Sequence, residues 1–340
     1  MSRMPRPADS RTASVDAPWD VRLTKRLLAA ASGRGIRGRV LVFSFHRVLP
    51  KQDPLLTGEP DAQTFGRWVD WIRSYLNVLK LPEAVALLER GELPPRSACI
   101  TFDDGYRNNF EVACPLLEHA GLPATFFIAA GAVDHGAMWN DLVIEAVRAC
   151  GDSLDLRDAG GGVWEIESEA HRPRVVAAAL DTLKYLPLEQ RSEIAEGLYQ
   201  RHCSVPRMDL MMTRAMVKAL AERGHDVGAH TVSHPILQNL APSAAREEIE
   251  SSREWVREVT GCSPLSFAYP NGRKGIDFTE LHMSMVETAG FRCAASTTWG
   301  CVTARSNPFA LERFSPWEFD RSGFVSRMLK TYVRSYLDAT

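Results

Sequence analysis

The sequence predicts an α/β fold, a distorted (β/α) barrel of about seven parallel strands with an inserted, mostly helical subdomain. Short apolar runs alternate with segments of helical periodicity along the 340-residue chain, and such alternation is typical of a parallel sheet with helical crossovers. Polar side chains follow four of these runs directly, and barrel strands bring such side chains together at one mouth. A doubly wound open sheet, the alternative, would concentrate its site near one switch point. The alternation also pauses for roughly a hundred residues, far longer than a normal connection.

The expected strands are short, apolar and separated by helices. We expect strands at residues 40–45, 77–81, 98–103, 124–129, 226–229, 265–268, 291–296 and 311–314. We expect helices between and around them at residues 21–31, 61–76, 82–90, 107–120, 209–223, 243–260, 277–289 and 320–337. Asp61 is a plausible N-cap, and Ser243 begins its helix with Glu247 in a capping arrangement.

The domain prediction has three parts. Residues 1–37 form a disordered or peripheral N-terminal segment, and residues 38–340 form the barrel. An insertion at about residues 135–208 interrupts the barrel, because the β-α alternation resumes after it. Within the insertion we expect a helix at 138–150, a hairpin at 153–168 and one or two helices over 172–203.

The bulk composition indicates an ordinary globular protein. Hydrophobic residues make up 45% and charged residues 24%, and the net charge of −2 gives no indication of nucleic-acid binding. Seven cysteines without a C-x-x-C pair favour reduced thiols. The N-terminal residues lack a signal-peptide core, and no apolar stretch is long enough for a transmembrane segment. We therefore expect a cytoplasmic protein. The basic amphipathic segment 21–31 could also place the protein at the inner membrane face. We favour the alternative, in which this segment packs on the protein body.

Two adjacent carboxylates, Asp103 and Asp104, follow the apolar run Ala98–Phe102. Like charges raise each other's pKa and burial disfavours the ionised forms, so such a pair is costly at a strand end. A metal ion or a catalytic duty would explain the cost. The alternative is a solvated Asp-Gly turn.

His230 and His234 follow another apolar run and are four residues apart. Histidines at this spacing can face one metal ion, and a carboxylate oxygen can complete a mixed nitrogen and oxygen set. Two histidines and one aspartate leave open positions, as in catalytic metal sites. Each histidine alone would be interpreted as a hydrogen-bonded surface or core residue. The run Phe267–Gly272 is a third motif, with a simple Pro-Asn-Gly turn as its alternative.

Together these three motifs resemble the polysaccharide deacetylase family (carbohydrate esterase 4, the NodB-homology group). Thr101–Tyr106 is similar to the family's first motif, His230–His234 to its second and Phe267–Gly272 to its third. The resemblance runs from about residue 38 to about residue 315, interrupted by the insertion.

The resemblance implies a role for each residue. Asp104, His230 and His234 would hold a divalent metal, with zinc as the expected ion, and Asp103 would be the general base. The main chain near Asn271 would stabilise the oxyanion. Three more residues would lie at the oxyanion or line the substrate site: Pro270, Tyr269 and Tyr106.

Two positions depart from the usual family pattern. The third motif lacks the arginine that orients the base in many members, and Arg313 is a candidate to replace it. The late histidine that usually serves as general acid is also missing. Phe45-His46-Arg47-Val48 resembles the N-terminal segment that supplies this histidine in the exopolysaccharide deacetylase subgroup, so His46 is the expected acid. Trp139 and Trp317 are candidates for a sugar platform, with a core role as the alternative.

These observations predict a metal-dependent hydrolase that removes an N-acetyl or other N-acyl group from an amino sugar of a polysaccharide or glycan precursor. Two alternatives stay open. One is a C–N hydrolase that acts on a non-sugar amide. The other is a catalytically inactive carbohydrate-binding protein that kept the fold.

Overall fold

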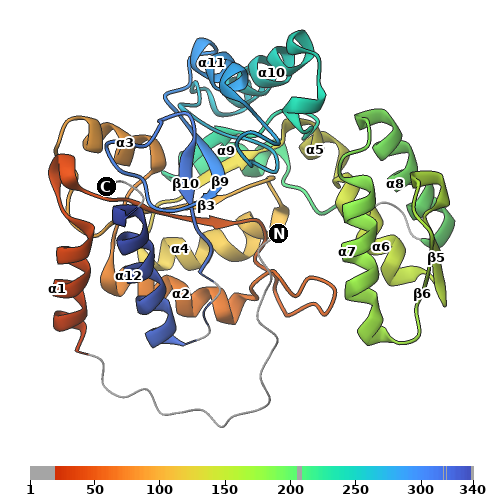
Figure 1. The fold of residues 1–340 in the computed structure, drawn as a ribbon, viewed down its shortest axis with the longest axis horizontal. Helices are drawn as coiled ribbons and strands as arrows, with labels where there is room; N and C mark the ends of the chain where they lie inside the picture. The colour runs from red at the N-terminus through yellow and green to blue at the C-terminus, as the bar shows by residue number, and fades with distance from the viewer. Residues whose placement is uncertain (1–19, 205–208, 317, 319, 338–340) are drawn as a thin grey trace.

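The computed structural model describes residues 20–204, 209–316, 318 and 320–337 (Figure 1). The first 19 residues and Trp317 lie outside this set, so the predicted N-terminal disorder and the predicted role of Trp317 stay untested. Within it, seven parallel strands follow one another in the order β1-β3-β4-β7-β8-β9-β10. They are β1 (Leu41–Phe45), β3 (Ser97–Phe102), β4 (Thr125–Ile128), β7 (Asp226–Ala229), β8 (Ser266–Ala268), β9 (Cys293–Trp299) and β10 (Leu311–Arg313).

The sheet curves back on itself until its two edge strands meet. Phe314, directly after β10, forms a parallel bridge to Phe43 in β1. The Ser44 N–H donates to the Phe314 carbonyl at 3.0 Å, and the Phe314 N–H donates to the Val42 carbonyl at 2.9 Å. These bonds nearly close the barrel and leave little exposed sheet edge. The predicted barrel of about seven parallel strands is confirmed.

The two faces of each strand pack against different partners. Phe45, Phe102 and Phe126 point outward, where Phe102 stacks on Phe126 with ring centroids 4.9 Å apart and lies 5.5 Å from Phe45. Val42, Cys99 and Phe127 belong to a separate inner cluster, which also contains Leu81, Val85 and Leu88 from outside the strands. Since both faces are buried, the strands have apolar runs instead of the alternating pattern of a half-exposed sheet.

Helices cover the outside of the barrel (Figure 1). They are α1 (Val21–Ser32), α2 (Ala62–Tyr75), α3 (Leu81–Glu89), α4 (Cys114–Ala120), α5 (Ala130–His135), α9 (Arg214–Glu222), α10 (Pro242–Thr260), α11 (Glu280–Thr288) and α12 (Arg321–Leu337). The predicted cap of α2 is confirmed, because the Asp61 carboxylate accepts from the Thr64 N–H at 2.8 Å.

Several predicted boundaries differ from the structure. The predicted strand 77–81 is reduced to β2 (Asn77–Val78), which pairs with β3. Helix α10 begins at Pro242, with no side-chain cap from Ser243, because proline has a fixed φ suited to the first helical turn. A π-helical turn at Asn109–Ala113 precedes α4 within the predicted helix 107–120. Helices α9 and α11 begin later than predicted, and α9 is capped by Thr213.

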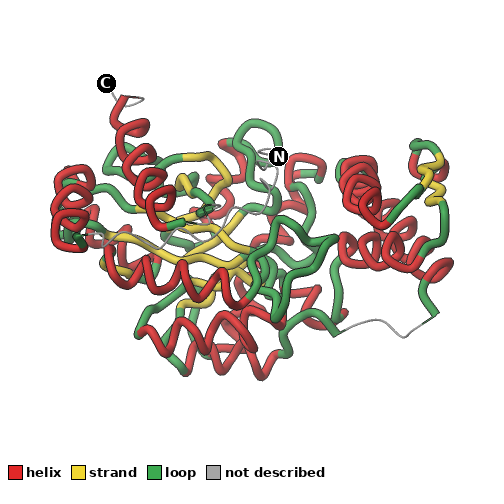
Figure 2. The backbone as a smooth tube through the Cα atoms, turned by 90° about the horizontal axis from the view of Figure 1, so that it is seen from below, coloured by secondary structure: helices red, strands yellow, loops and turns green. Residues whose placement is uncertain are grey.

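The segment between β4 and β7 contains a helical unit with its own hydrophobic cluster. Its elements are α6 (Trp139–Ala149), β5 (Ser153–Asp155), β6 (Val163–Glu165), α7 (Arg172–Leu183) and α8 (Leu188–His202). Strands β5 and β6 form the expected antiparallel hairpin. Figure 2 shows this unit beside the barrel, at one end of the molecule. Its cluster is built from residues such as Val143, Ala179 and Leu198 and is separate from the barrel clusters.

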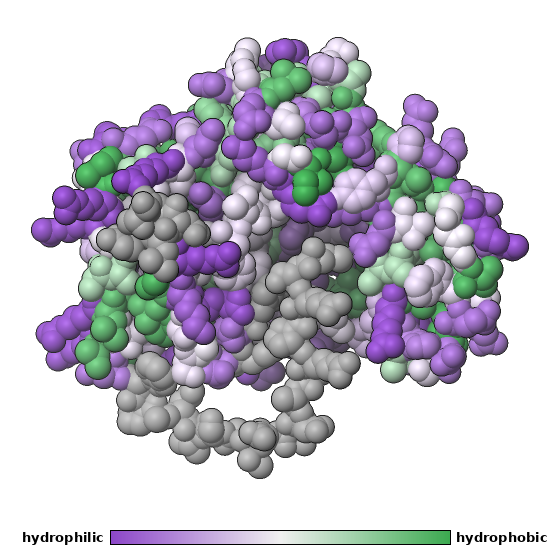
Figure 3. All heavy atoms as spheres, viewed as in Figure 1, coloured by the Kyte–Doolittle hydropathy of each residue, from purple (hydrophilic) through white to green (hydrophobic). Residues whose placement is uncertain are grey.

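The described surface gives no sign of a membrane-crossing element. No helix among the described residues combines the length and the apolar character needed to cross a bilayer. On the face shown in Figure 3, hydrophobic side chains are scattered among hydrophilic ones.

Candidate active site

The candidate site lies at the carboxyl ends of the barrel strands. His46 follows β1, Asp103 and Asp104 follow β3, and His230 follows β7. The site also concentrates the unusual backbone geometry of the chain. Five non-glycine residues among those described have positive φ, and four of them belong to the three motifs: Asp104, Thr231, His234 and Asn271. Such conformations cost energy and persist where the surroundings enforce them, often at functional sites.

Asp104, His230 and His234 meet at one point. The Nε2 atoms of both histidines lie 3.4 Å from Oδ1 of Asp104, and the ligand atoms of the three residues lie within 4.8 Å of one another. Nδ1–H of His230 donates to the carbonyl of Ala268 at 2.7 Å. This bond fixes the tautomer, so Nε2 of His230 presents its lone pair to the shared point.

The electrostatics of this group suit a cation. Oδ1 of Asp104 is buried without a hydrogen-bond partner among the described residues. Burial lowers the pKa of His234 to about 3, so its imidazole is neutral. Burial opposes ionisation of Asp104, but the neighbouring imidazoles of His230, His234 and His46 hold the pKa of this carboxyl well below its usual range. An ionised carboxylate and two neutral imidazoles are the ligand forms that a divalent metal requires.

A second group of metal-ligand side chains, Cys114, Glu118 and His225, fits a metal poorly. Nδ1 of His225 accepts the Ala124 N–H at 3.2 Å, so the neutral ring carries its proton on Nε2. That nitrogen faces Sγ of Cys114 at 3.4 Å. Burial also raises the pKa of the Cys114 thiol to about 12, with a further contribution from Glu118. A protonated nitrogen beside a protonated thiol leaves no pair of ligand atoms for an ion.

Asp103 is held by Arg313 inside the barrel. The two guanidinium NH2 groups donate to Oδ1 and Oδ2 of Asp103 at 2.7 and 2.8 Å. Nε of Arg313 donates to the Ser296 carbonyl at 2.8 Å, and both ion-pair partners are nearly inaccessible to solvent. Burial raises the pKa of Asp103, but the charge and hydrogen bonds of Arg313 outweigh it and hold this pKa below the usual value. Arg313 therefore holds both carboxylate oxygens of Asp103 in one orientation.

His46 lies at the rim of the same site. Its Nε2 is 3.8 Å from Oδ2 of Asp103, and its side chain is 48% exposed. Partial desolvation of the ring by the surrounding protein lowers its pKa, but the carboxylates of Asp104, Asp103 and Glu59 outweigh this effect and raise the pKa above 6.5. The imidazole is thus biased toward its protonated form.

A cavity of about 280 Å³ opens onto these residues. Tyr269, Asn271 and Trp139 line it, together with His46 and the Asp-His-His group. The remaining predicted residues lie elsewhere. Tyr106 is buried behind the site, where its hydroxyl donates to Asp141 at 3.2 Å and accepts from Asn140 at 3.1 Å. Pro270 is buried in the third-motif turn, outside the cavity lining.

Sequence reasoning missed several residues that support the site. Glu248 on α10 accepts the N–H groups of Val232 and Ser233 at 2.8 and 3.0 Å and the Ser233 hydroxyl at 2.5 Å. It thereby holds the loop between the two histidines. Asp141 on α6 receives bonds from Arg47 and Tyr106 and joins the inserted unit to the barrel. A glutamate on a helix has no local sequence signal for such a contact, since its partner loop is distant in the chain.

The comparisons with known proteins agree with this fold and motif set. The profile of the polysaccharide deacetylase family matches residues 90–294, which is more than half of the chain. The chain therefore belongs to the polysaccharide deacetylase family, whose members are generally metal-dependent. The matched part contains Asp103, Asp104, His230 and His234, whereas His46 and Arg313 lie outside it.

One curated relative is a poly-beta-1,6-N-acetyl-D-glucosamine N-deacetylase of Staphylococcus epidermidis. It is 26% identical over 149 residues, which cover 40% of this chain and 49% of the relative. The chain thus spans about half of the length of that relative.

Two solved structures have the same fold. The deacetylase PplD of Streptococcus pyogenes, in complex with acetate, has a TM-score of 0.59 at 16% identity, over 86% of this chain and 99% of that one. IcaB from Ammonifex degensii has a TM-score of 0.54 at 18% identity, over 88% of this chain and 98% of that one.

The position of Glu248 leads to a prediction about metal binding. We expect Glu248→Ala to weaken metal affinity about 10- to 100-fold, because residues that orient metal ligands typically contribute this much. Competition with a chromogenic chelator measures the change. The neighbouring Glu247 is exposed, so Glu247→Ala is a matched control that should keep full affinity. Equal affinity in both variants would show that Glu248 does not position the ligands.

Proposed function

We propose that the protein is a metal-dependent hydrolase that removes N-acetyl groups from amino sugars of a glycan. The observation that carries this proposal is the different environment of two adjacent carboxylates. Asp104 faces two histidines and has an unpartnered oxygen, whereas Asp103 is paired with Arg313. One carboxylate is suited to bind a cation and the other to accept a proton, the combination that metal-assisted amide hydrolysis needs.

Asp104, His230 and His234 would hold the ion, and we propose zinc. When bound, a divalent ion at this point would polarise the amide carbonyl and lower the pKa of the attacking water. The three side chains offer one carboxylate oxygen and two imidazole nitrogens, a set that suits zinc and leaves room for water and substrate. The identity of the metal stays part of the proposal.

Asp103 would act as general base. Arg313 keeps this carboxylate ionised and fixes both of its oxygens, so it can accept a proton from water in one defined orientation. His46 would act as general acid. Its raised pKa favours the protonated ring, and it lies on the exposed side of Asp103, where a departing amine can be reached.

The third motif would stabilise the negative charge on the amide oxygen. Asn271 has φ of 61°, and no hydrogen bond among the described residues uses its N–H. The Asn271 and Gly272 carbonyls both accept bonds from Thr297 of β9, which hold this turn in place. Tyr269 packs behind it, with its ring stacked on Phe278 at 3.7 Å and its hydroxyl bonded to the Phe309 carbonyl at 3.0 Å. A preorganised main-chain donor is a common feature of acyl-transfer sites.

The cavity supports an amino-sugar glycan as the substrate class. The helical unit between β4 and β7 contributes Trp139, Leu180, Asp181 and Lys184 to the lining. Trp139 offers an aromatic wall beside the proposed metal ligands. We propose that this unit covers the mouth and shapes the substrate. The relative from Staphylococcus epidermidis has a poly-N-acetylglucosamine activity in its name. The cytoplasmic location and peripheral membrane contact predicted from the sequence stay predictions.

Acetate release tests the proposal against both alternatives. We expect the purified, metal-loaded protein to release acetate from N-acetylglucosamine oligomers, to lose this activity when a chelator removes the metal, and to regain it with zinc. A coupled acetate assay and elemental analysis measure the two quantities. Activity only on small non-sugar amides would favour the C–N hydrolase alternative. Bound glycan without acetate release or metal would favour the binding protein.

The role of His46 leads to a separate prediction. We expect His46→Gln to lower kcat by about 10²- to 10⁴-fold, the usual contribution of a general acid, while the metal content stays intact. The surface residue His119, at the end of α4, gives the control variant His119→Gln, which should keep full turnover. Loss of metal on His46→Gln would contradict the assignment, because the residue would then act through the metal site.

The Asp103–Arg313 pair predicts a pH effect. Arg313 lowers the pKa of Asp103, so activity that needs the ionised base is lost only when the pH falls through this lowered value. Arg313→Lys keeps a positive charge but loses the two-pronged contact, so the pKa of Asp103 rises. We expect the acidic limb of the kcat/KM profile to move to higher pH. An unchanged acidic limb, with the fold intact by circular dichroism, would show that Asp103 does not control it.

A further inference from the structure

Arg191, on α8 of the inserted unit, is a buried cation beside the catalytic cavity. It is 2% exposed, and an arginine guanidinium keeps its charge in proteins. No carboxylate among the described residues forms an ion pair with it. Buried arginines are normally paired, because an isolated buried charge is costly. Arg191 therefore lacks the anionic partner that a buried guanidinium normally has.

The guanidinium also has unused hydrogen-bond donors. Arg191 has five N–H groups, and one bond to a described residue is formed, from a terminal NH2 to the His234 carbonyl at 3.3 Å. Nε is buried without a partner. The guanidinium carbon lies 4.8 Å from the centre of the Trp139 ring, in a cation–π contact. The ring and the carbonyl fix the orientation of the guanidinium but supply no negative charge.

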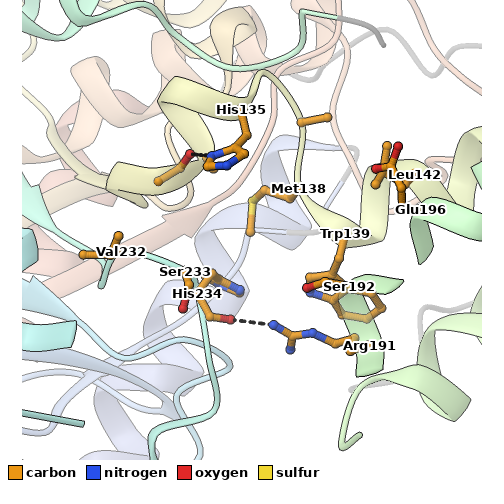
Figure 4. A pocket seen from close by; sticks show the side chains of 13 residues that line it. His135, Met138, Trp139, Leu142, Arg191, Ser192, Glu196, Val232, Ser233 and His234 are labelled. Carbon is orange, nitrogen blue, oxygen red and sulfur yellow. Dashed lines mark hydrogen bonds between the residues drawn. The ribbon is translucent and has the colours of Figure 1, made fainter. Parts of the chain in front are cut away.

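Arg191 lines a cavity of about 310 Å³ that adjoins the catalytic cavity. The two cavities share Met138, Trp139 and His234. Figure 4 shows the guanidinium beside the Trp139 ring, directed at His234. A ligand bound at Asp104, His230 and His234 can therefore extend along Trp139 toward Arg191.

The other polar side chains of this cavity are already engaged. The Ser192 hydroxyl donates to the Leu188 carbonyl at 2.9 Å, and the Ser233 hydroxyl donates to Glu248. Glu196 accepts from Gln200 at 3.1 Å, and Nδ1–H of His135 donates to the Gly131 carbonyl. Arg191 is the positively charged lining residue with N–H groups left to offer.

We propose that Arg191 binds an oxyanion, a carboxylate or a phosphate, carried by the substrate glycan next to the N-acetylated sugar. A guanidinium presents a planar fork of donors that matches either group. The sugar between the two groups would lie against Trp139. This inference rests on the proposed function and narrows its substrate class to acidic glycans.

Lys184, just after α7, is a second cation near the two cavities, but it is a weaker candidate for binding the oxyanion. It lines the catalytic cavity and also a neighbouring cavity that Arg191 lines. Burial lowers the pKa of Lys184, and the carboxylates of Asp277 and Asp181 only partly counter this effect. The proposed anion site is therefore assigned to Arg191 alone.

Substrates of matched size test the proposal. N-acetylglucosamine oligomers are the neutral probe, and oligosaccharides that alternate N-acetylglucosamine with glucuronate are the acidic probe. We expect a lower KM for the acidic probe in the unaltered protein. Arg191→Gln should raise this KM about 10- to 100-fold, as expected for one charge-assisted contact. The KM for the neutral probe, kcat for both probes and the metal content should change less than about twofold, and Arg191→Lys should restore part of the affinity.

Arg201 provides a matched control on the same helix. It is half exposed and pairs with Asp158, so Arg201→Gln should leave both KM values unchanged. Equal losses on the two probes, or loss of metal, in Arg191→Gln would overturn the proposal, because Arg191 would then only support the His234 loop. Equal KM values for the two probes in the unaltered protein would also overturn it.

A binding measurement separates this inference from the proposed function. D-glucuronate and D-glucose 1-phosphate are titrated into the unaltered protein and into Arg191→Gln by calorimetry, with D-glucose as the uncharged control. We expect binding of at least one anion by the unaltered protein, lost in the variant, whether or not acetate is ever released. Preference between the two anions identifies the carboxylate or the phosphate. Absence of binding by both would overturn the anion site, and acetate release would still stand as the test of the enzyme.

Discussion

The two-pronged contact between Asp103 and Arg313 is the interaction on which the site depends. It joins the ends of β3 and β10 inside the barrel, and the same guanidinium donates to Ser296 on β9. Since β1 lies between β3 and β10 in the sheet, the pair spans the place where the barrel closes. A buried pair of this kind contributes little net stability, but removal of one partner leaves an uncompensated charge and typically costs about 3–5 kcal/mol. Closure of the barrel and orientation of the Asp103 carboxylate are therefore coupled.

This contact also explains how two adjacent carboxylates share one strand end. Asp103 and Asp104 point to different partners because Asp104 adopts φ of 75°, which turns the chain directly after β3. Asp103 meets a guanidinium, and Asp104 meets two imidazoles. Opposite environments can give chemically identical groups different roles, as in hydrolases with paired carboxylates. Without Arg313, mutual repulsion and burial would favour protonation of one of them.

The inserted unit contributes to the site although no motif lies in it. Its Trp139, Asp181 and Lys184 line the cavity that opens onto His46, Asp103 and Asp104, and the Arg191 guanidinium lies over the Trp139 ring. The unit is tied to the barrel by Asp141, which is bonded to Arg47 and Tyr106. Tyr106 is thus a structural link behind the site and not part of the cavity wall. A unit with its own hydrophobic cluster can vary its lining residues without disturbing the barrel, which makes it suited to determine substrate choice.

The sequence by itself determined the barrel class and the motif residues that meet at the candidate site. Apolar runs that are buried on both faces and followed by polar side chains are local features, so Asp103, Asp104, His230 and His234 could be recognised from their motifs. The tertiary structure decided which distant residues complete the site. Arg313 follows Asp103 by more than two hundred positions, and only barrel closure brings its guanidinium within 2.7 Å of that carboxylate. The contacts of Glu248 and Arg191 depend on helix packing. The local sequence around a charged residue in a helix does not show whether its side chain faces solvent or a buried loop. Local chemistry therefore identified the motifs, whereas long-range packing decided what orients them.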